Sequence, residues 1–389
     1  MITISNGIVI TQDARRRVIQ GNVIVEGDAI TSVGKKSERS DIVIDAKGGI
    51  VMPGLINMHT HVGMTTLRGA VDCSNLTRFL EETAKFDRRN TREKVKESAS
   101  MAAAEMIATG TTSFLDLYYS EDAIAEEAER AGIRAFLSWV VLDKEHTTQV
   151  GDPIRNAEAF VKKYKNKRTV MPSFGLQGVY ACSKDTIQET DRLAEEHGTI
   201  LHMHLAETKE EVRSHVKKYS MRPVEWMRRN RFLSSRLVAA HAVWVDDKEM
   251  SMLARSGTTV VNNAVSNARL GSGTARIKEM LKRGINVALG TDSAASNDSL
   301  DMFQTMKFSA LINGLTAQEA LDAATVSAAK ALRCNTGSIE EGKKADIIVI
   351  GRRQSICPLS KKNAVSNAVF AAQGSDVAKS IINGAVING

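Results

Sequence analysis

The feature that most constrains the fold is a regular alternation, across the middle of the chain, between short apolar segments and charged segments of helix length. The intervening segments, such as 122–131 and 184–197, are amphipathic. A strand followed by a helix, repeated eight times, is the pattern of a (β/α)8 TIM barrel, an α/β fold. The eight strand-like segments are 50–58, 111–117, 133–140, 169–174, 199–205, 237–242, 258–262 and 285–290.

The two ends of the chain have a different pattern of apolar and polar residues. Residues 1–50 form short alternating apolar and polar runs separated by glycine-containing turns, which is typical of antiparallel strands. Residues 345–351 and 377–389 show the same pattern. We therefore expect 1–50 and 336–389 to form one small β-sandwich domain, and 51–335 to form a separate catalytic barrel.

Composition excludes several classes of protein. With 43% hydrophobic and 25% charged residues in 389, the chain is expected to be globular. Its net charge of +7 comes from scattered basic groups without interleaved aromatic residues, so we expect no nucleic-acid partner. No apolar run approaches the ~18 residues of a membrane span. The start lacks a signal-peptide pattern, and four separated cysteines give no disulfide framework, which favours a cytoplasmic location.

Two histidines close the first barrel segment as His59-Thr60-His61. Residues two apart in a strand point to the same face, so both imidazoles can face the mouth of a barrel and hold one metal ion. Alone, the pair is a weak signal, because packed or exposed histidines are more common than ligands.

Further candidates lie at the ends of the fifth, sixth and eighth segments. His204 ends the fifth, and Glu207 follows in the loop, where it can shuttle a proton or cap the next helix. His202 shares the inward face one layer deeper, which favours a hydrogen-bonded histidine over a ligand. His241 ends the sixth segment and Asp292 the eighth. Taken singly, a buried histidine and a helix N-cap are the commoner explanations.

As a set, these residues indicate a catalytic metal centre, because active sites of TIM barrels lie at the carboxyl ends of the strands. Three imidazoles and one carboxylate suit a single divalent ion, with zinc ahead of iron or manganese. Such an ion lowers the pKa of bound water toward ~7. Asp292 can then take a proton from the water, His241 can orient it, and Glu207 can protonate the substrate.

The segments MPGLINMHTH, HLAET, AAHAVW, SNARLGSG and LGTDSAASN resemble the amidohydrolase superfamily. The branch they resemble contains S-adenosylhomocysteine and methylthioadenosine deaminases, guanine deaminase and triazine hydrolases, and the resemblance spans nearly the whole chain. It implies a homo-oligomer and a site with one metal ion, in which Glu207, His241 and Asp292 are catalytic. The metal ligands that it implies are His59, His61, His204 and Asp292.

The residues expected to contact the substrate depart from that branch. Gln177 and Asn262 stand where adenosine-type relatives carry histidines, Trp139 replaces an arginine, and Phe79 a tryptophan. Gln177 can donate and accept hydrogen bonds, and Arg269 can supply charge. Trp139 and Phe79 can stack on a flat ring, with core packing as an equal alternative. A solvated loop position is the alternative for Arg269.

The sequence therefore predicts a metal-dependent hydrolase that deaminates an N-heterocyclic amine, with attack by a metal-bound hydroxide and release of ammonia. A 5′-modified adenosine, such as S-adenosylhomocysteine or methylthioadenosine, is the first substrate expected. One alternative changes the leaving group, as in triazine and N-ethylammeline chlorohydrolases, or opens a cyclic amide. The alternative of another class is a non-catalytic metal-binding scaffold. The proton-transferring residues argue against that scaffold, since structural metal sites are usually closed by four protein ligands.

Overall fold

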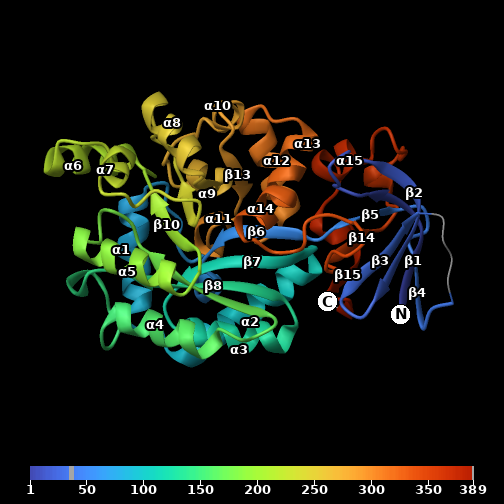
Figure 1. The fold of residues 1–389 in the computed structure, drawn as a ribbon, viewed down its shortest axis with the longest axis horizontal. Helices are drawn as coiled ribbons and strands as arrows, with labels where there is room; N and C mark the ends of the chain where they lie inside the picture. Colours follow the sequence, from blue (N-terminus) through green and yellow to red (C-terminus); the bar gives the residue numbers. More distant parts are fainter. Residues whose placement is uncertain (35–38, 388–389) are drawn as a thin grey trace.

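The computed structural model describes residues 1–34 and 39–387 as a helix-covered barrel with a mixed β-sheet at one end (Figure 1). The barrel sheet has eight parallel strands that pair in chain order. These strands are β6 (Leu55–Thr60), β7 (Thr111–Tyr118), β8 (Arg134–Val141), β9 (Val170–Leu176), β10 (Leu201–Leu205), β11 (Leu237–His241), β12 (Thr259–Asn262) and β13 (Asn286–Leu289). Parallel strands covered by helices are buried on both faces, which explains their apolar sequences.

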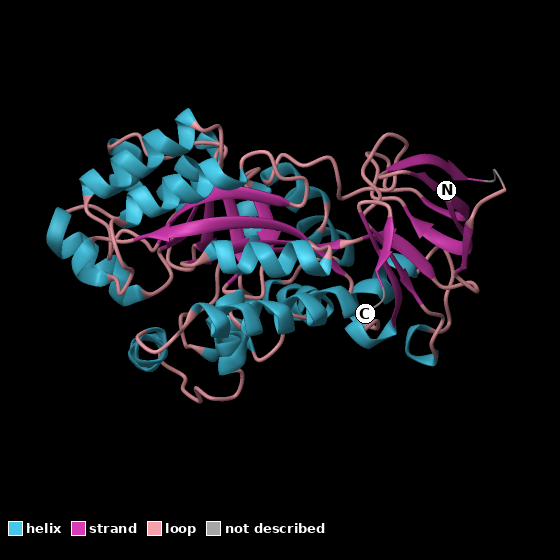
Figure 2. Ribbon diagram, turned by 90° about the horizontal axis from the view of Figure 1, so that it is seen from below, coloured by secondary structure: helices cyan, strands magenta, loops and turns pink. Residues whose placement is uncertain are grey.

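Helices surround the barrel strands (Figure 2). The α-helices are α1 (Leu76–Asp87), α2 (Arg92–Ala108), α3 (Glu121–Ala131), α4 (Pro153–Tyr164), α5 (Lys184–Glu196), α6 (Lys209–Tyr219), α7 (Pro223–Arg229), α8 (Asp247–Ser256), α9 (Ala264–Arg269), α10 (Ile277–Lys282), α11 (Ala294–Asn297), α12 (Met302–Asn313), α13 (Ala317–Ala324), α14 (Val326–Ala331) and α15 (Ala364–Phe370). Short 3₁₀ helices are η1 (Val62–Leu67), η2 (Lys144–His146), η3 (Gln354–Ile356) and η4 (Gly374–Asp376). Within the described ranges, every helix is too short or too polar to cross a bilayer.

Side chains and backbone groups join the first and last barrel strands. Asn57 donates from Nδ2 to Thr291 Oγ1 at 2.7 Å and accepts from the Thr291 amide at 3.0 Å. The Asp292 amide donates to the His59 carbonyl at 2.8 Å. A Cβ atom at Gly290 would lie 2.7 Å from the backbone nitrogen of His59, so only glycine allows the two strands to approach this closely. These contacts bring Asp292 beside His59 of β6 and His61, which directly follows that strand.

Both chain ends enter one mixed sheet, as the sequence predicted. Its strands follow the order β16-β15-β14-β5-β1-β2-β3, with β4 paired to β1. They are β1 (Ile2–Ile10), β2 (Val18–Glu26), β3 (Ala29–Gly34), β4 (Ile42–Asp45), β5 (Ile50–Pro53), β14 (Ile347–Ile350), β15 (Val377–Ile382) and β16 (Ala385–Ile387). The pairings define a single sheet, and the sandwich and the two domain boundaries stay predictions. Residues 35–38 and 388–389 of the predicted end segments lie outside the described residues.

The apolar segment 50–58 is two strands rather than the single barrel strand we predicted. Its first part, β5, pairs with β1 and β14 in the terminal sheet, and its second part, β6, begins the barrel. The chain passes between the sheets at Gly54, where a Cβ atom would lie 2.2 Å from the Thr112 side chain. Because both strands are fully buried, hydrophobicity alone does not mark the division.

A buried ion pair ties the barrel to the terminal sheet, and breaking it is expected to destabilise the protein. Arg134, at the start of β8, donates to both carboxylate oxygens of Asp346 at 3.0 and 3.1 Å. Arg134→Met should lower the free energy of unfolding by about 3–5 kcal/mol, because a buried carboxylate loses its partner. A lower urea midpoint measures the effect. Lys162→Met, which breaks an exposed pair, is the control, and equal midpoints for both variants would contradict the expectation.

Candidate active site

The predicted ligands and catalytic residues converge at the carboxyl ends of four barrel strands. His59 and His61 come from β6 and its end, His204 from β10, His241 from β11, and Asp292 follows β13. Asp292 Oδ1 lies 3.2 Å from His61 Nε2 and 3.6 Å from His59 Nε2. Candidate ligand atoms of His59, His61 and Asp292, and likewise of His59, His204 and His241, lie within 4.8 Å of one another.

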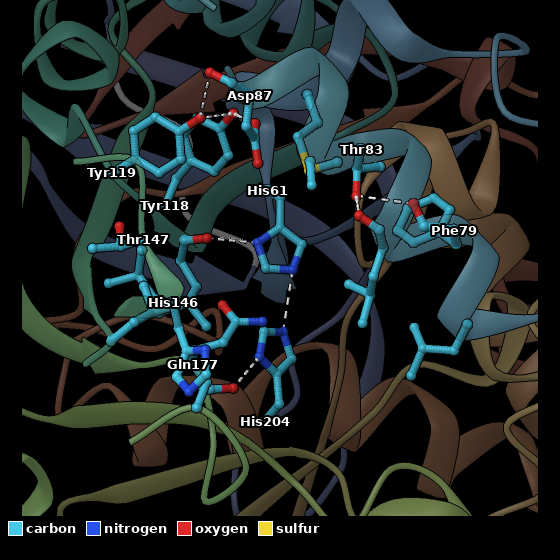
Figure 3. Close-up of a pocket in the computed structure, with 18 of the residues that line it drawn as sticks. His61, Phe79, Thr83, Asp87, Tyr118, Tyr119, His146, Thr147, Gln177 and His204 are labelled. Atoms are coloured by element: carbon cyan, nitrogen blue, oxygen red, sulfur yellow. Dashed lines mark hydrogen bonds between the residues drawn. The ribbon is translucent and has the colours of Figure 1, made fainter. Parts of the chain in front are cut away.

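Backbone carbonyls orient two of the imidazoles. His61 donates from Nδ1 to the Leu117 carbonyl at 2.5 Å, and His204 from Nδ1 to the Gln177 carbonyl at 2.8 Å (Figure 3). With Nδ1 protonated, the neutral ring carries its lone pair on Nε2. The two Nε2 atoms face each other at 3.3 Å, an arrangement that requires a cation or a proton at this position.

His59 is placed as a metal ligand is, with one ring nitrogen fixed by a neighbouring side chain and the other left without a partner. Its Nδ1 lies 2.9 Å from His202 Nε2, whereas its own Nε2 is buried without a hydrogen-bond partner. His202 is thus a hydrogen-bonded histidine inside the barrel, as the sequence predicted. A fixed imidazole with one unpartnered nitrogen, beside two more imidazoles and a carboxylate, is a donor set that fits zinc.

The charges of His61 and Asp292 depend on each other. Burial alone disfavours a charged His61, but the hydrogen bond and charge of Asp292 outweigh it and raise the pKa of His61 to about 9. Burial alone favours a protonated Asp292, but His61 holds the pKa of that carboxyl well below its usual range. Without a metal, a proton therefore lies where two potential ligands meet.

Glu207 and His241 form the other half of the site. Glu207 accepts from Ser272 Oγ at 2.9 Å, and its second oxygen lies 3.8 Å from His241 Nε2. His241 donates from Nδ1 to Asn267 Oδ1 at 2.7 Å, which leaves Nε2 toward Glu207. Burial raises the pKa of Glu207, so this carboxyl holds a proton at a higher pH than an exposed glutamate.

A second glutamate fixes the turn that carries Glu207. The half-buried side chain of Glu211 accepts from the amides of Ala206 and Glu207 at 2.9 and 2.7 Å. Ala206 has a φ of 49°, in the left-handed region, so the turn needs such support. The sequence did not reveal the role of Glu211, because an acidic residue in the first turn of a helix is usually explained by the helix dipole.

A cavity of about 470 Å³ opens in front of this cluster, and two of the five predicted substrate residues line it. Phe79 contributes from α1, and Gln177 from the end of β9. The Gln177 amide donates to the Tyr180 hydroxyl at 2.8 Å. The cavity therefore extends from the histidines to side chains of α1 and of the loops after β8 and β9.

Asp87, Tyr118 and Tyr119 also line the cavity (Figure 3), and none of the three was predicted from the sequence. Tyr118 donates to Asp87 Oδ1 at 2.7 Å, and the two tyrosine rings stack with centroids 4.4 Å apart. Burial raises the pKa of Asp87. In the sequence, Asp87 sits among charged residues at a helix end, where exposure to solvent is the usual expectation.

Trp139 lies outside the cavity, contrary to its predicted contact with the substrate. It alternates along β8 with Val140, which does line the cavity, so the indole points to the outside of the barrel. There it packs on Phe160 of α4 at 5.7 Å between centroids and donates to Gln149 at 2.8 Å. Core packing, the stated alternative, describes this position.

Asn262 and Arg269 also lie outside the cavity. Asn262 donates to Ser309 of α12 at 2.8 Å and is buried in the wall between β12 and that helix. Arg269 forms an ion pair with Asp298, donates to the Val71 carbonyl at 3.3 Å and lines a separate hollow. Both polar groups are engaged by partners from distant parts of the sequence.

Comparisons with known proteins agree over nearly the whole chain. The model of the amidohydrolase family matches residues 50–387. A 5-methylthioadenosine/S-adenosylhomocysteine deaminase of Thermococcus sibiricus is 37% identical, over 99% of this chain and 93% of the relative. A 5′-deoxyadenosine deaminase of Methanosarcina mazei is 36% identical, over 99% and 92%. The crystal structure of an adenosine deaminase from Xanthomonas campestris with bound zinc has a TM-score of 0.95 at 27% identity, covering 99% of this chain and 92% of that one.

Proposed function

Because the chain belongs to the amidohydrolase family, we propose that it hydrolytically deaminates a 5′-modified adenosine. The similar deaminases act on methylthioadenosine, S-adenosylhomocysteine and 5′-deoxyadenosine, as their names state. The observation that carries the proposal is the placement of Glu207: a buried carboxyl lines the cavity beside three imidazoles and Asp292. A structural metal site has no use for such a group.

The donor set supports a role for one divalent ion, held by His59, His61, His204 and Asp292. Zinc suits these ligands, and the similar adenosine deaminase contains it. When bound, the ion lowers the pKa of water and so supplies a nucleophile near neutral pH.

The side chains of this chain then move the protons. Water adds to the ring carbon that bears the amine, and Asp292 accepts a proton from the water. Glu207 gives its proton to the neighbouring ring nitrogen, and a further proton transfer lets the amine leave as ammonia. His241, fixed by Asn267, orients the attacking oxygen. The balance is one water consumed and one ammonia released, with oxygen in place of the amine.

Asp87 provides a binding group at a distance from this chemistry. One of its oxygens accepts from Tyr118, and an ionised carboxylate has about four acceptor positions. Asp87 therefore retains acceptor capacity toward the cavity, which suits the hydroxyl donors of a ribose.

A metal-replete screen for ammonia release tests the proposal. The panel contains methylthioadenosine, 5′-deoxyadenosine, S-adenosylhomocysteine, guanine, cytosine, an aminotriazine, a chlorotriazine and a cyclic amide. We expect ammonia from the adenosine compounds, with the absorbance change from adenine to hypoxanthine. Chloride release from a chlorotriazine, or ring opening without ammonia, would favour the other leaving groups. No turnover by zinc-loaded protein would favour the scaffold.

A further inference from the structure

We infer that the cavity selects adenosines whose 5′ substituent is uncharged and discriminates against a 5′ amino-acid tail. The inference rests on the proposed function, because it concerns which member of that substrate class is accepted. It separates methylthio- and deoxy-adenosine, as good substrates, from S-adenosylhomocysteine, whose tail carries a carboxylate and an ammonium group.

The first support is the charge of the cavity. Among the described residues that line it, none is a lysine or an arginine, and His146 at the exposed rim is the one basic side chain besides the clustered His61, His204 and His241. The acidic groups besides Asp292 are Asp87 and Glu207. A carboxylate entering this space loses hydration without gaining a cationic partner, which is costly.

The second support is the character of the remaining walls. With the amine at the histidines and the sugar at Asp87, the 5′ substituent faces either α1 or the loops after β8 and β9. The α1 wall presents Leu76, Phe79 and Leu80, and the opposite wall presents Val140, Leu142 and Ala181. Either orientation therefore gives a methylthio group an apolar surface. The loops after β8 and β9 also present Thr147, Thr148 and Gln177, which offer a carboxylate neutral hydrogen bonds but no lysine or arginine.

No cation among the described residues near the cavity supplies the missing partner for a carboxylate. Arg78 and Arg269 line the separate hollow on the other side of the first turn of α1, and Arg269 is paired with Asp298. Lys144 precedes the rim but does not line the cavity. Among described residues, the cavity thus lacks the guanidinium or ammonium group that a carboxylate tail needs.

Three substrates of the zinc-loaded wild-type protein separate charge from size. We expect kcat/KM for 5′-butylthioadenosine, which has a long uncharged tail, to stay within about threefold of methylthioadenosine. We expect kcat/KM for S-adenosylhomocysteine to fall at least about tenfold below both, since its carboxylate remains without a cationic partner. Equal values for the butylthio and homocysteine compounds would overturn charge selection. No ammonia from any of the three would overturn the proposed function itself.

Adding a cation to each wall tests whether the lack of a cation there causes the selection against a charged tail. Leu80→Arg and Leu142→Arg are compared with Leu80→Gln and Leu142→Gln, which change size and polarity without charge. At least one arginine variant should raise kcat/KM for S-adenosylhomocysteine relative to methylthioadenosine by about fivefold, through a lower KM. Turnover of methylthioadenosine shows that each variant is folded. An unchanged ratio in both arginine variants would overturn the assignment to a missing cation.

Discussion

Glu207→Gln is expected to lower kcat by about 10²–10⁴-fold while the protein keeps its metal. Glutamine preserves the shape of the side chain and can still accept from Ser272, as Glu207 does at 2.9 Å. It cannot deliver a proton to a ring nitrogen. Steady-state ammonia release, together with the metal content of the same samples, measures the two effects separately.

Glu210→Gln is the matched control for this variant. Glu210 lies three residues away on the exposed face of α6, so the same chemical change there should leave kcat within about twofold. A Glu207→Gln protein that keeps more than a tenth of wild-type kcat would contradict proton transfer by Glu207. A variant that loses its metal would instead indicate that Glu207 is a ligand.

The barrel could be predicted because parallel strands covered on both faces have continuous apolar sequences. The histidine positions followed from the same logic, since the end of a strand fixes which rim of the barrel a residue reaches. The division at Gly54 could not be seen, because β5 and β6 are both fully buried although they belong to different sheets. The hydrophobicity of a segment indicates that it is buried, but it does not indicate to which of two sheets the segment belongs.

The substrate wall was predicted poorly for a related reason. A shift of one residue in a strand reverses the face, so Trp139 lies outside the barrel while Val140 lines the cavity. Asp87 reaches the cavity from a helix end, and Tyr118 makes it part of the site by a hydrogen bond across 31 residues of sequence. Arg269 is removed from the site by its ion pair with Asp298. These outcomes depend on tertiary partners that local patterns do not specify.

Removing the metal is expected to abolish ammonia release, and adding zinc is expected to restore it. The site prepares for the ion through carbonyl groups that hold His61 and His204, and these contacts do not depend on the ion. His59→Gln should therefore weaken zinc binding by at least about 100-fold without unfolding the barrel, because the loss of a ligand exceeds the 10–100-fold cost of losing a ligand's support.

A buried histidine remote from the site is the control for that variant. His215 of α6 donates to the Met221 carbonyl at 2.9 Å and packs on Tyr219 and Trp226, so His215→Gln should leave zinc affinity unchanged. Equal zinc affinity in the two variants would contradict ligation by His59. Full activity in protein shown to be free of metal would contradict the metal requirement altogether.

The affinity of the protein for zinc is expected to depend on pH. In the metal-free protein Asp292 raises the pKa of His61 to about 9, so below that pH a proton occupies the position that zinc must take. Lowering the pH therefore favours the proton, and the zinc dissociation constant should rise as pH falls from about 9 toward 7. Zinc addition in weakly buffered solution at pH 6, where most zinc-bound water keeps its proton, should release about one proton per site. Zinc uptake without proton release would show that His61 is already neutral, and that the pair with Asp292 does not compete with the ion.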